Sequence, residues 1–404
     1  MKIILFLTDN EKFSFDKTGA AALKTSHLVA LNQISEYHIH VIILGNSPNT
    51  EVNYLENILP IIETERISLT ALSLNYNKPK TKYYQILTNY FFSYGSIRKQ
   101  GTIFSTINHF NISQLNSTIN RINPDIIWTE HLEPSLLMSH INFEGIKVYS
   151  HHDFLSKLIL IRRKKLKDYI NSYIVKKIQT SFIKKFGTHV TAASENEIAE
   201  IKRIAPNSKL YYQPTIYPPI TVKWSEVKPQ ILRIIHLGTL RATANKVGLL
   251  NLLKYVLPKL KGNIQFECWI IGDLTNADKE TVTLLNDECV NCIGYVEDLT
   301  TVLRPADIHL LPYNYATGTR TRLPLIFNHG QLVIAHKEAV NGMRDIENNV
   351  NCVVVNDFSE MANKIIELGK DFKLRTSIAK RAKQKHDILF NFGNYSEKLK
   401  AFLS

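Results

Sequence analysis

The stretch that most constrains this chain runs over residues 308–335, IHLLPYNYATGTRTRLPLIFNHGQLVIA. Its apolar run predicts a buried strand over Ile308–Pro312, and a second apolar run predicts another over Leu332–Ala335. Between them lie a Gly/Thr-rich turn and a helical segment over Leu323–Asn328, which Gly330 ends. This order of elements predicts a βαβ unit with parallel strands. The turn lies at the carboxyl end of a strand, where open α/β sheets bind ligands, so we expect a binding site there.

Two arginines, Arg320 and Arg322, directly follow this turn. Backbone N–H groups at the start of a helix attract anions, and guanidinium groups bind phosphate oxygens in pairs. We therefore expect Arg320 to contact a phosphate. For Arg322 we expect a salt bridge to a nearby acid ahead of that role.

Strand–loop–helix alternation recurs along both halves of the chain. In the first half, apolar runs predict buried strands over residues 2–7, 38–45, 124–130, 146–150 and 189–193. A second series begins at Ile231, after a Pro-containing linker that starts at Tyr217. A chain of 404 residues, 44% of them apolar, has enough material for two cores. We predict an α/β protein with doubly wound parallel sheets, with domains over residues 1–220 and 221–380 and a helical tail over 381–404.

The formal net charge of +13 suggests a polyanionic partner: nucleic acid, an anionic membrane or phosphate-bearing substrates. The alternative is a soluble basic protein with none of these partners. The sequence contains no zinc-finger or RNA-binding motif, and its basic residues lack the aromatic interleaving of a single-strand groove. Nucleic acid is therefore not an expected partner.

Residues 157–186 carry ten Lys or Arg against a single acid, Asp168, with apolar residues at mostly helical spacing. This pattern is typical of a basic amphipathic helix on an anionic membrane surface. It is equally typical of a domain helix that buries an apolar stripe and leaves its basic face in water. Both interpretations stay open.

Other features narrow the class of protein. Four cysteines are too few for a disulfide framework, and the C-x-x-C of Cys289 and Cys292 lacks a second ligand pair, so no metal site is expected. No apolar run reaches the roughly 20 residues that span a bilayer. The first apolar run is too short for a signal peptide, so the expected location is the cytoplasm.

Several motifs in the carboxyl-terminal half occur in a fixed order. They are a strand, a Gly and a loop with Arg and Lys over His236–Lys246, a strand ending in Gly-Asp at Ile270–Asp273, Gly294–Leu299 (GYVEDL), Ala306–Pro312, and Gly318–Arg320 followed by Gly330. In this combination the chain resembles GT-B glycosyltransferases, and within them the large retaining family 4. The resemblance implies two Rossmann-like domains that face each other across a cleft, with carboxyl-terminal helices packing back on the amino-terminal domain. The first half would bind the acceptor and the second the nucleotide sugar.

The resemblance also implies roles for residues. Arg241 and Lys246 would contact the donor diphosphate, with Arg320 and the backbone of the Gly318 turn as second candidates. Preorganised cations and N–H donors can stabilise a leaving diphosphate without a metal, so neither a metal nor a cofactor is expected. The loop before Gly19 would approach the donor, although an ordinary helix-start turn explains this glycine equally well. The expected donor-binding residues are Gly19, Gly238, Arg241, Lys246, Thr317, Gly318, Thr319 and Arg320.

His151, His152 and Asp153 follow a predicted strand in the first half, where the family places a His near the reacting sugar. One imidazole would hydrogen-bond the donor sugar or stabilise developing charge, and Asp153 would orient it. Asp9 and Glu130, also at strand ends, are weaker candidates for binding acceptor hydroxyls.

One departure from the family pattern leaves two functions open. The family carries two glutamates separated by seven residues, and this chain has Thr317 and Leu325 at those positions. The first function is a retaining transferase that moves a sugar from a nucleotide sugar to a glycan or lipid-linked acceptor for a surface polysaccharide. It would work in the cytoplasm, peripherally on the inner face of the plasma membrane through residues 157–186. The second is a non-catalytic GT-B-like protein that binds a nucleotide or glycan.

Overall fold

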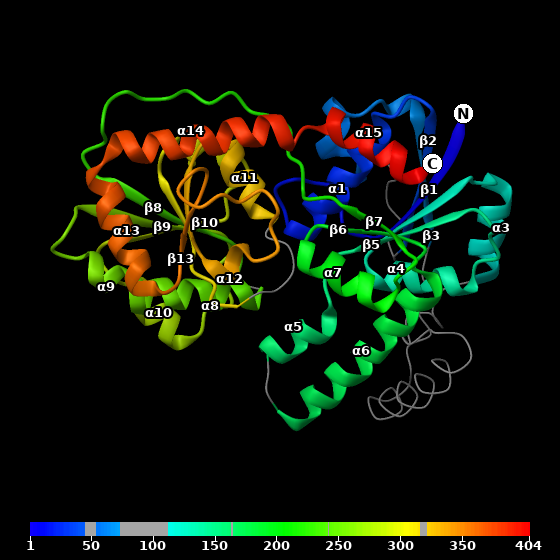
Figure 1. Cartoon of the computed structure of the whole chain (residues 1–404), viewed down its shortest axis with the longest axis horizontal. Coiled ribbons are helices and arrows are strands. Elements are labelled where there is room, and N and C mark those ends of the chain that lie inside the picture. Colours follow the sequence, from blue (N-terminus) through cyan, green and yellow to red (C-terminus); the bar gives the residue numbers. More distant parts are fainter. Residues whose placement is uncertain (45–53, 73–111, 163–164, 241, 316–320) are drawn as a thin grey trace. The chain divides into compact units, whose positions relative to one another are not determined.

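The computed structural model describes residues 1–44, 54–72, 112–162, 165–240, 242–315 and 321–404. It divides into two compact units (Figure 1). Unit 1 consists of Met1–Thr215 with Phe392–Ser404, and unit 2 of Ile216–Asn391. Each unit has one parallel sheet with helices packed against it, which confirms the predicted α/β class.

The sheet of unit 1 has seven strands in the order β3-β2-β1-β4-β5-β6-β7. Neighbouring strands all pair in parallel, and the chain moves outward from β1 to β3 before it returns to place β4 on the other side of β1. The carboxyl ends of β1 and β4 therefore flank a topological switch point, which is where sheets of this kind bind ligands. The strands are β1 Lys2–Asp9, β2 Tyr37–Leu44, β3 Ile67–Leu72, β4 Ile126–Glu130, β5 Ile146–His151, β6 His189–Ala192 and β7 Lys209–Tyr212.

The longest buried helix of unit 1 is α1, in which twelve of fourteen residues are buried. It is partly covered by the last helix of the chain, α15, whose Ser396 Oγ donates to the Ala30 carbonyl at 2.7 Å. The α-helices are α1 Gly19–Asn32, α3 Ile112–Ile122, α4 Leu132–Leu136, α5 Leu155–Arg162, α6 Leu166–Phe186, α7 Glu195–Ile204 and α15 Phe392–Leu403. Short 3-10 helices cover η2 Glu56–Ile61, η3 Thr64–Arg66 and η5 Leu137–His140.

The sheet of unit 2 has six parallel strands in the order β10-β9-β8-β11-β12-β13, with its switch point between β8 and β11. The predicted βαβ unit is confirmed: its strands are β11 and β12, and its helix is α11. The strands are β8 Leu232–Leu237, β9 Phe266–Ile271, β10 Val290–Gly294, β11 Ile308–Leu311, β12 Leu332–His336 and β13 Val353–Val355. The helices are α8 Thr243–Asn251, η6 Leu252–Val256, α9 Leu257–Leu260, α10 Lys279–Leu285, η7 Leu299–Thr301, α11 Arg322–Asn328, α12 Lys337–Val340, α13 Phe358–Lys370 and α14 Phe372–Leu389.

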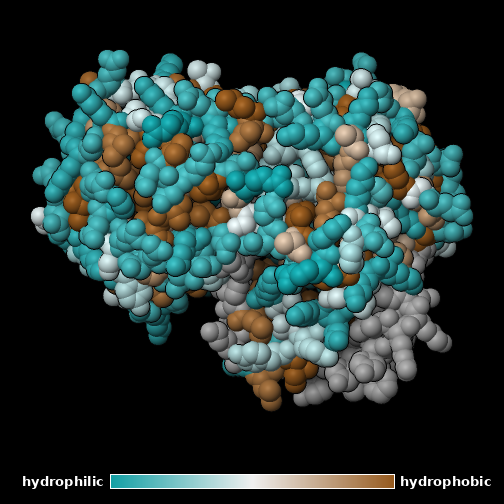
Figure 2. All heavy atoms as spheres, in the orientation of Figure 1, coloured by the Kyte–Doolittle hydropathy of each residue, from teal (hydrophilic) through white to brown (hydrophobic). Residues whose placement is uncertain are grey.

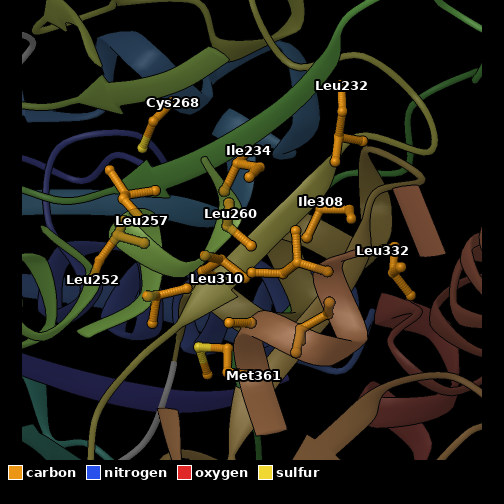
Figure 3. Packing of buried hydrophobic residues seen from close by; sticks show 14 of the residues in the cluster. Leu232, Ile234, Leu252, Leu257, Leu260, Cys268, Ile308, Leu310, Leu332 and Met361 are labelled. Atoms are coloured by element: carbon orange, nitrogen blue, oxygen red, sulfur yellow. The ribbon is translucent and has the colours of Figure 1, made fainter. Parts of the chain in front are cut away.

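Apolar side chains from the strands and helices of unit 2 meet in a large core (Figure 3). Ile234 and Leu310 come from central strands and Leu257 from a covering helix, and all three are at most 2% exposed. Burial of such side chains contributes roughly 1.5–3 kcal/mol each. The core extends to Ile378 and Ala379, so α14 belongs to unit 2. The units therefore divide at residues 215/216 and 391/392, whereas the sequence had suggested boundaries after residues 220 and 380.

The stretch over residues 157–186 is not one helix. Lys165 has an extended backbone, with φ −85° and ψ 155°, and separates α5 from α6. The two helices pack together, and Ser172 Oγ donates to the Ser156 carbonyl at 2.8 Å. Only the second half of α6 buries its apolar residues, Ile178 and Phe182 among them.

Unit 2 contains a buried ion pair that provides a stability test. Arg233 Nε donates to Asp307 Oδ2 at 2.8 Å, and the two side chains are 6% and 9% exposed. Replacing Asp307→Ala leaves a buried guanidinium without its carboxylate, so we expect the free energy of unfolding to fall by about 3–5 kcal/mol. Glu367→Ala, which breaks the exposed pair with Lys364, should cost at most about 1 kcal/mol. Urea unfolding of both variants checks this, and equal losses would contradict it.

Candidate functional site

Four titratable side chains lie at the carboxyl edge of the unit 1 sheet, around its switch point. Asp9 ends β1, Glu130 ends β4, His131 follows it, and His152 follows β5. Because parallel strands end at the same edge, residues more than 100 positions apart in sequence come together here.

The centre of this group is Glu130, whose side chain is fully buried. Its carboxylate contacts His27 Nδ1 at 2.7 Å, Trp128 Nε1 at 2.6 Å and His152 Nε2 at 2.7 Å. Burial alone would raise the pKa of Glu130, but the charge and hydrogen bonds of His27 and His152 hold it well below its ordinary value. An ionised carboxylate only accepts hydrogen bonds, so all three nitrogens donate to it.

His152 is thereby fixed through one ring nitrogen, and its side chain is 9% exposed. Nε2 donates to Glu130, so in the neutral imidazole Nδ1 is the acceptor. The ring of His131 lies against it, with centroids 3.7 Å apart. His131 has the left-handed φ of 64°, which is uncommon for a residue other than Gly and places its ring at this edge. Burial, followed by the charge of His152, lowers the pKa of His131 to about 3, so His131 is neutral at neutral pH.

The remaining carboxylate at this edge, Asp9, is bound by a buried lysine of α1. Lys24 Nζ contacts Asp9 Oδ1 at 2.6 Å, and His131 Nε2 lies 3.7 Å from Asp9 Oδ2. Burial acts to raise the pKa of Asp9, but Lys24 and His131 lower it overall. The helix that carries Lys24 begins at Gly19, which is exposed, after Thr18 caps its first turn.

His151 does not lie with His152. It is 1% exposed and lies in the core, with Nδ1 3.0 Å from the Tyr149 hydroxyl and Nε2 3.7 Å from Glu197. Successive side chains of a strand point to opposite faces, and this alternation turns His151 into the core, while His152, the residue after β5, reaches Glu130 at the edge. Ser194 and Glu197 have the sequence spacing of a capping box. In the structure Ser194 makes no side-chain cap, and Glu197 is buried facing His151.

Asp153 was expected to orient an imidazole, but Glu130 supplies the carboxylate that contacts His152. The backbone carbonyl of Asp153 accepts from Gln179 Nε2 at 2.9 Å. The expectation that Glu130 binds an acceptor hydroxyl also needs correction, because its buried oxygens already face three donors.

The edge of the unit 2 sheet is formed by three glycine-containing strand ends that bond to one another. Gly238 N donates to the Ile271 carbonyl at 2.8 Å, and Gly272 N donates to the Gly294 carbonyl at 2.7 Å. Gly238 has φ +146° and Gly272 φ +134°, and a Cβ on Gly272 would lie 2.6 Å from the Gly238 carbonyl oxygen. Only glycine fits at these two positions. Without side chains there, the backbone of the loop after β8 packs directly against the neighbouring strand end at Gly272.

A cation lies directly against this loop. Arg322 Nη1 donates to the Tyr313 hydroxyl at 2.6 Å, and Nη2 donates to Asn245 Oδ1 at 2.9 Å. Asn245 Nδ2 in turn donates to the Thr239 carbonyl at 2.8 Å. No carboxylate in the described part of the chain pairs with Arg322, so the expected salt bridge is not formed there. Burial and this guanidinium lower the pKa of nearby His236 to about 3, which keeps that imidazole neutral.

Among the other predicted donor-binding residues, Lys246 lies in the first turn of α8 and is half-buried. Arg241, Thr317, Gly318, Thr319 and Arg320 lie outside the described residues. Leu325 is 8% exposed inside α11, so an apolar side chain packs where the family pattern has its second glutamate. Within the described residues, no group of three His, Cys, Asp or Glu side chains could hold a metal ion.

Sequence reasoning missed His27, Trp128 and His131 in unit 1, and Asn245 and Tyr313 in unit 2. Tyr313 and Asn245 are 68 positions apart, and His27 and Glu130 are 103 positions apart. No local motif signals such pairs, since the sheet topology brings them together.

Two Rossmann-like units with these strand-edge loops define the GT-B fold of glycosyltransferases. Residues 232–371, all within unit 2, match the family model described as Glycosyl transferases group 1. No curated protein sequence matches the chain.

Solved structures that resemble the chain along nearly its whole length share this fold. Alr3699/HepE from Anabaena, in complex with UDP and glucose, is 14% identical with a TM-score of 0.66, over 100% of this chain and 99% of that one. A TarM mutant from S. aureus, in complex with Fondaparinux, alpha-GlcNAc-glycerol and UDP, is 11% identical with a TM-score of 0.67 over 100% of both chains. WaaG, a glycosyltransferase involved in lipopolysaccharide biosynthesis, is 12% identical with a TM-score of 0.61, over 100% and 99%. At these identities the likeness establishes the fold, while the activity depends on the site.

The buried carboxylate of Glu130 leads to a prediction about pH. Glu130→Gln keeps the shape but turns an NH₂ group toward one of three donors, so we expect a loss of about 1–3 kcal/mol at pH 7. The folded-state pKa of Glu130 lies below its ordinary 4.5, so the stability from its ionised form is complete above that pH. This stability is lost as pH falls through the folded-state pKa. The difference in free energy of unfolding between the unchanged protein and the Glu130→Gln variant should therefore narrow at low pH.

Urea unfolding from pH 7 downward measures this gap. The control is Glu200→Gln, which removes an acid of the same unit that pairs with the exposed Lys157. A gap that stays constant to the lowest pH at which the protein folds would contradict the role given to Glu130.

Proposed function

We propose that this protein is a glycosyltransferase that moves a sugar from a nucleotide-sugar donor to a glycan or lipid-linked acceptor. The observation that carries the proposal is the match of residues 232–371 to the Glycosyl transferases group 1 model. Arg322, a cation without a described carboxylate partner beside a glycine-lined strand edge, supports an anionic ligand at the same place.

In this proposal unit 2 binds the donor. Arg241, Lys246 and Arg320 contact the diphosphate and stabilise the charge that develops on it as the glycosidic bond breaks. Arg322 holds Asn245 and Tyr313 together and so positions the loop after β8. No metal or cofactor takes part, so excess EDTA should leave the rate unchanged.

Unit 1 contributes His152, which Glu130 orients, and Asp9 at the neighbouring strand end. We propose that His152 hydrogen-bonds the transferred sugar and that the anomeric configuration is retained, as the family resemblance implies. The configuration of the product, assigned by NMR, tests retention directly. WaaG, which has the same fold, is involved in lipopolysaccharide biosynthesis. This supports a surface glycan as the product. We propose that the protein makes it in the cytoplasm at the inner face of the plasma membrane.

A second candidate function is a non-catalytic protein that binds a nucleotide or glycan. The buried Leu325 favours it, because this side chain cannot accept the hydrogen bonds from the donor's ribose that the resemblance implies for the glutamate at this position. A panel of UDP-, GDP-, CMP- and dTDP-linked sugars separates the two functions by thermal shift and donor hydrolysis. HepE and TarM were both solved with UDP, so UDP sugars come first. Stabilisation with slow hydrolysis supports the transferase, and stabilisation without turnover supports the binding protein. If no sugar nucleotide stabilises the protein or is hydrolysed, both functions are contradicted.

Lys246 allows a sharper test of the donor site. Lys246→Ala should lower donor turnover at least tenfold and leave the melting temperature nearly unchanged, because a half-buried surface cation contributes to phosphate binding more than to folding. The matched control is Lys254→Ala, which removes a lysine of the following turns that pairs with exposed Glu280. Full turnover in the Lys246 variant would overturn its assignment.

A further inference from the structure

The first half of α6 carries four large apolar side chains that solvent reaches. Leu166 is 79% exposed, Tyr169 50%, Ile170 49% and Tyr173 62%. Their spacing of i, i+3, i+4 and i+7 places them on one face of the helix. We call these four residues the hairpin patch, because α5 and α6 pack together as a helical hairpin.

The same helix buries its apolar side chains further along. Ile178, Phe182 and Ile183 are each at most 1% exposed and pack in the core of unit 1. The exposed face is therefore not a general property of α6. It is confined to the part of the helix that extends beyond the core.

The hairpin patch is carried by an ordered element. Asp168 is buried, and its carboxylate accepts from the Lys165 backbone N–H at 3.1 Å, which caps the start of α6. Ser172 Oγ bonds to the Ser156 carbonyl and joins α6 to α5. Both helices extend from unit 1 at the lower edge of the view (Figure 1), and Figure 2 shows hydrophobic atoms gathered at their free end.

Basic side chains flank the apolar face at both of its ends. Lys165, Lys176 and Lys177 are exposed, and Lys177 Nζ lies 5.5 Å from the centre of the Tyr173 ring. Residues 157–186 contain ten Lys or Arg and one acid, and that acid, Asp168, is buried by its capping role. The surface presented to a partner is thus apolar at its centre and positive at its rim.

This combination identifies the partner. Apolar side chains enter the boundary between headgroups and acyl chains, tyrosines favour the interface, and lysines are attracted to anionic headgroups. A second copy of the chain fits poorly, because a symmetric contact between two such patches would bring their lysines together. We propose that the hairpin patch docks this protein on the surface of a bilayer that contains anionic phospholipid.

The inference adds to the proposed function, since it names the surface that would bring the enzyme to a lipid-linked acceptor. Lipid binding can nevertheless be measured without any sugar transfer. The two hypotheses can therefore fail separately. Within the part of the chain that the structure describes, no helix is long and apolar enough to cross a bilayer.

Sedimentation with vesicles tests the docking. The full-length protein is mixed with phosphatidylcholine vesicles with or without 30% phosphatidylglycerol (roughly the anionic content of a charged bilayer). We expect binding to the anionic vesicles that weakens with added salt. Leu166→Ser, Tyr169→Ser, Ile170→Ser and Tyr173→Ser together should weaken it at least tenfold, and so should Lys165→Gln, Lys176→Gln and Lys177→Gln together.

The matched control changes four exposed apolar residues of unit 2, namely Val227→Ser, Tyr255→Ser, Val282→Ser and Ile388→Ser, which are 49–77% exposed. It should bind vesicles as the unchanged protein does.

Equal vesicle binding by the hairpin-patch variant and the control would overturn the proposal. So would a dimer in light scattering that the hairpin-patch variant abolishes without any vesicle binding by the unchanged protein. Donor hydrolysis without vesicles should be the same in all variants, and its loss in every protein would count against the transferase function only.

Discussion

The burial of an ionised carboxylate determines the arrangement of the unit 1 edge. Taking a charge such as Glu130 out of water is costly unless donors replace the water, and here three nitrogens do so. These donors come from α1, from β4 and from the residue after β5. One buried charge therefore fixes two strands and a helix relative to one another. It also fixes the tautomer and orientation of His152, the partly exposed imidazole at the edge.

The edge of the unit 2 sheet is also held in a fixed arrangement, here by close packing of the backbone. Gly238 and Gly272 approach so closely that no side chain fits between them, and Arg322 packs against the same loop. Its bonds to Tyr313 and Asn245 link the ends of β8 and β11 through α8 and α11. In one unit a buried anion organises the edge, and in the other a partly buried cation does.

The sequence predicted the architecture well because its signals are local. The apolar runs at Ile308 and Leu332, with the glycines between them, indicate strands, turn and helix within 28 residues. The site was predicted less completely, because its contacts are between distant residues. His27 lies in no motif, and nothing in the 308–335 stretch marks Tyr313 as a site residue. Only the strand order brings each to its partner. Adjacent residues also mislead: the pair His151 and His152 looked equivalent, but the alternation of a strand sends one into the core. The hydrophobic spacing of residues 157–186 predicted helix, but the break at Lys165 and the exposure of Leu166 depend on tertiary structure.

The return of α15 to unit 1 has a consequence for how the protein is made. Six of its twelve residues, Phe392 and Leu399 among them, are buried, and they complete the cover over α1. Unit 1 is therefore discontinuous in sequence, with all of unit 2 inserted between its two parts. Domains generally fold as units during synthesis, so the unit encoded second can complete its core first. The unit encoded first must wait, with the apolar face of α1 uncovered, until residues 392–404 have left the ribosome.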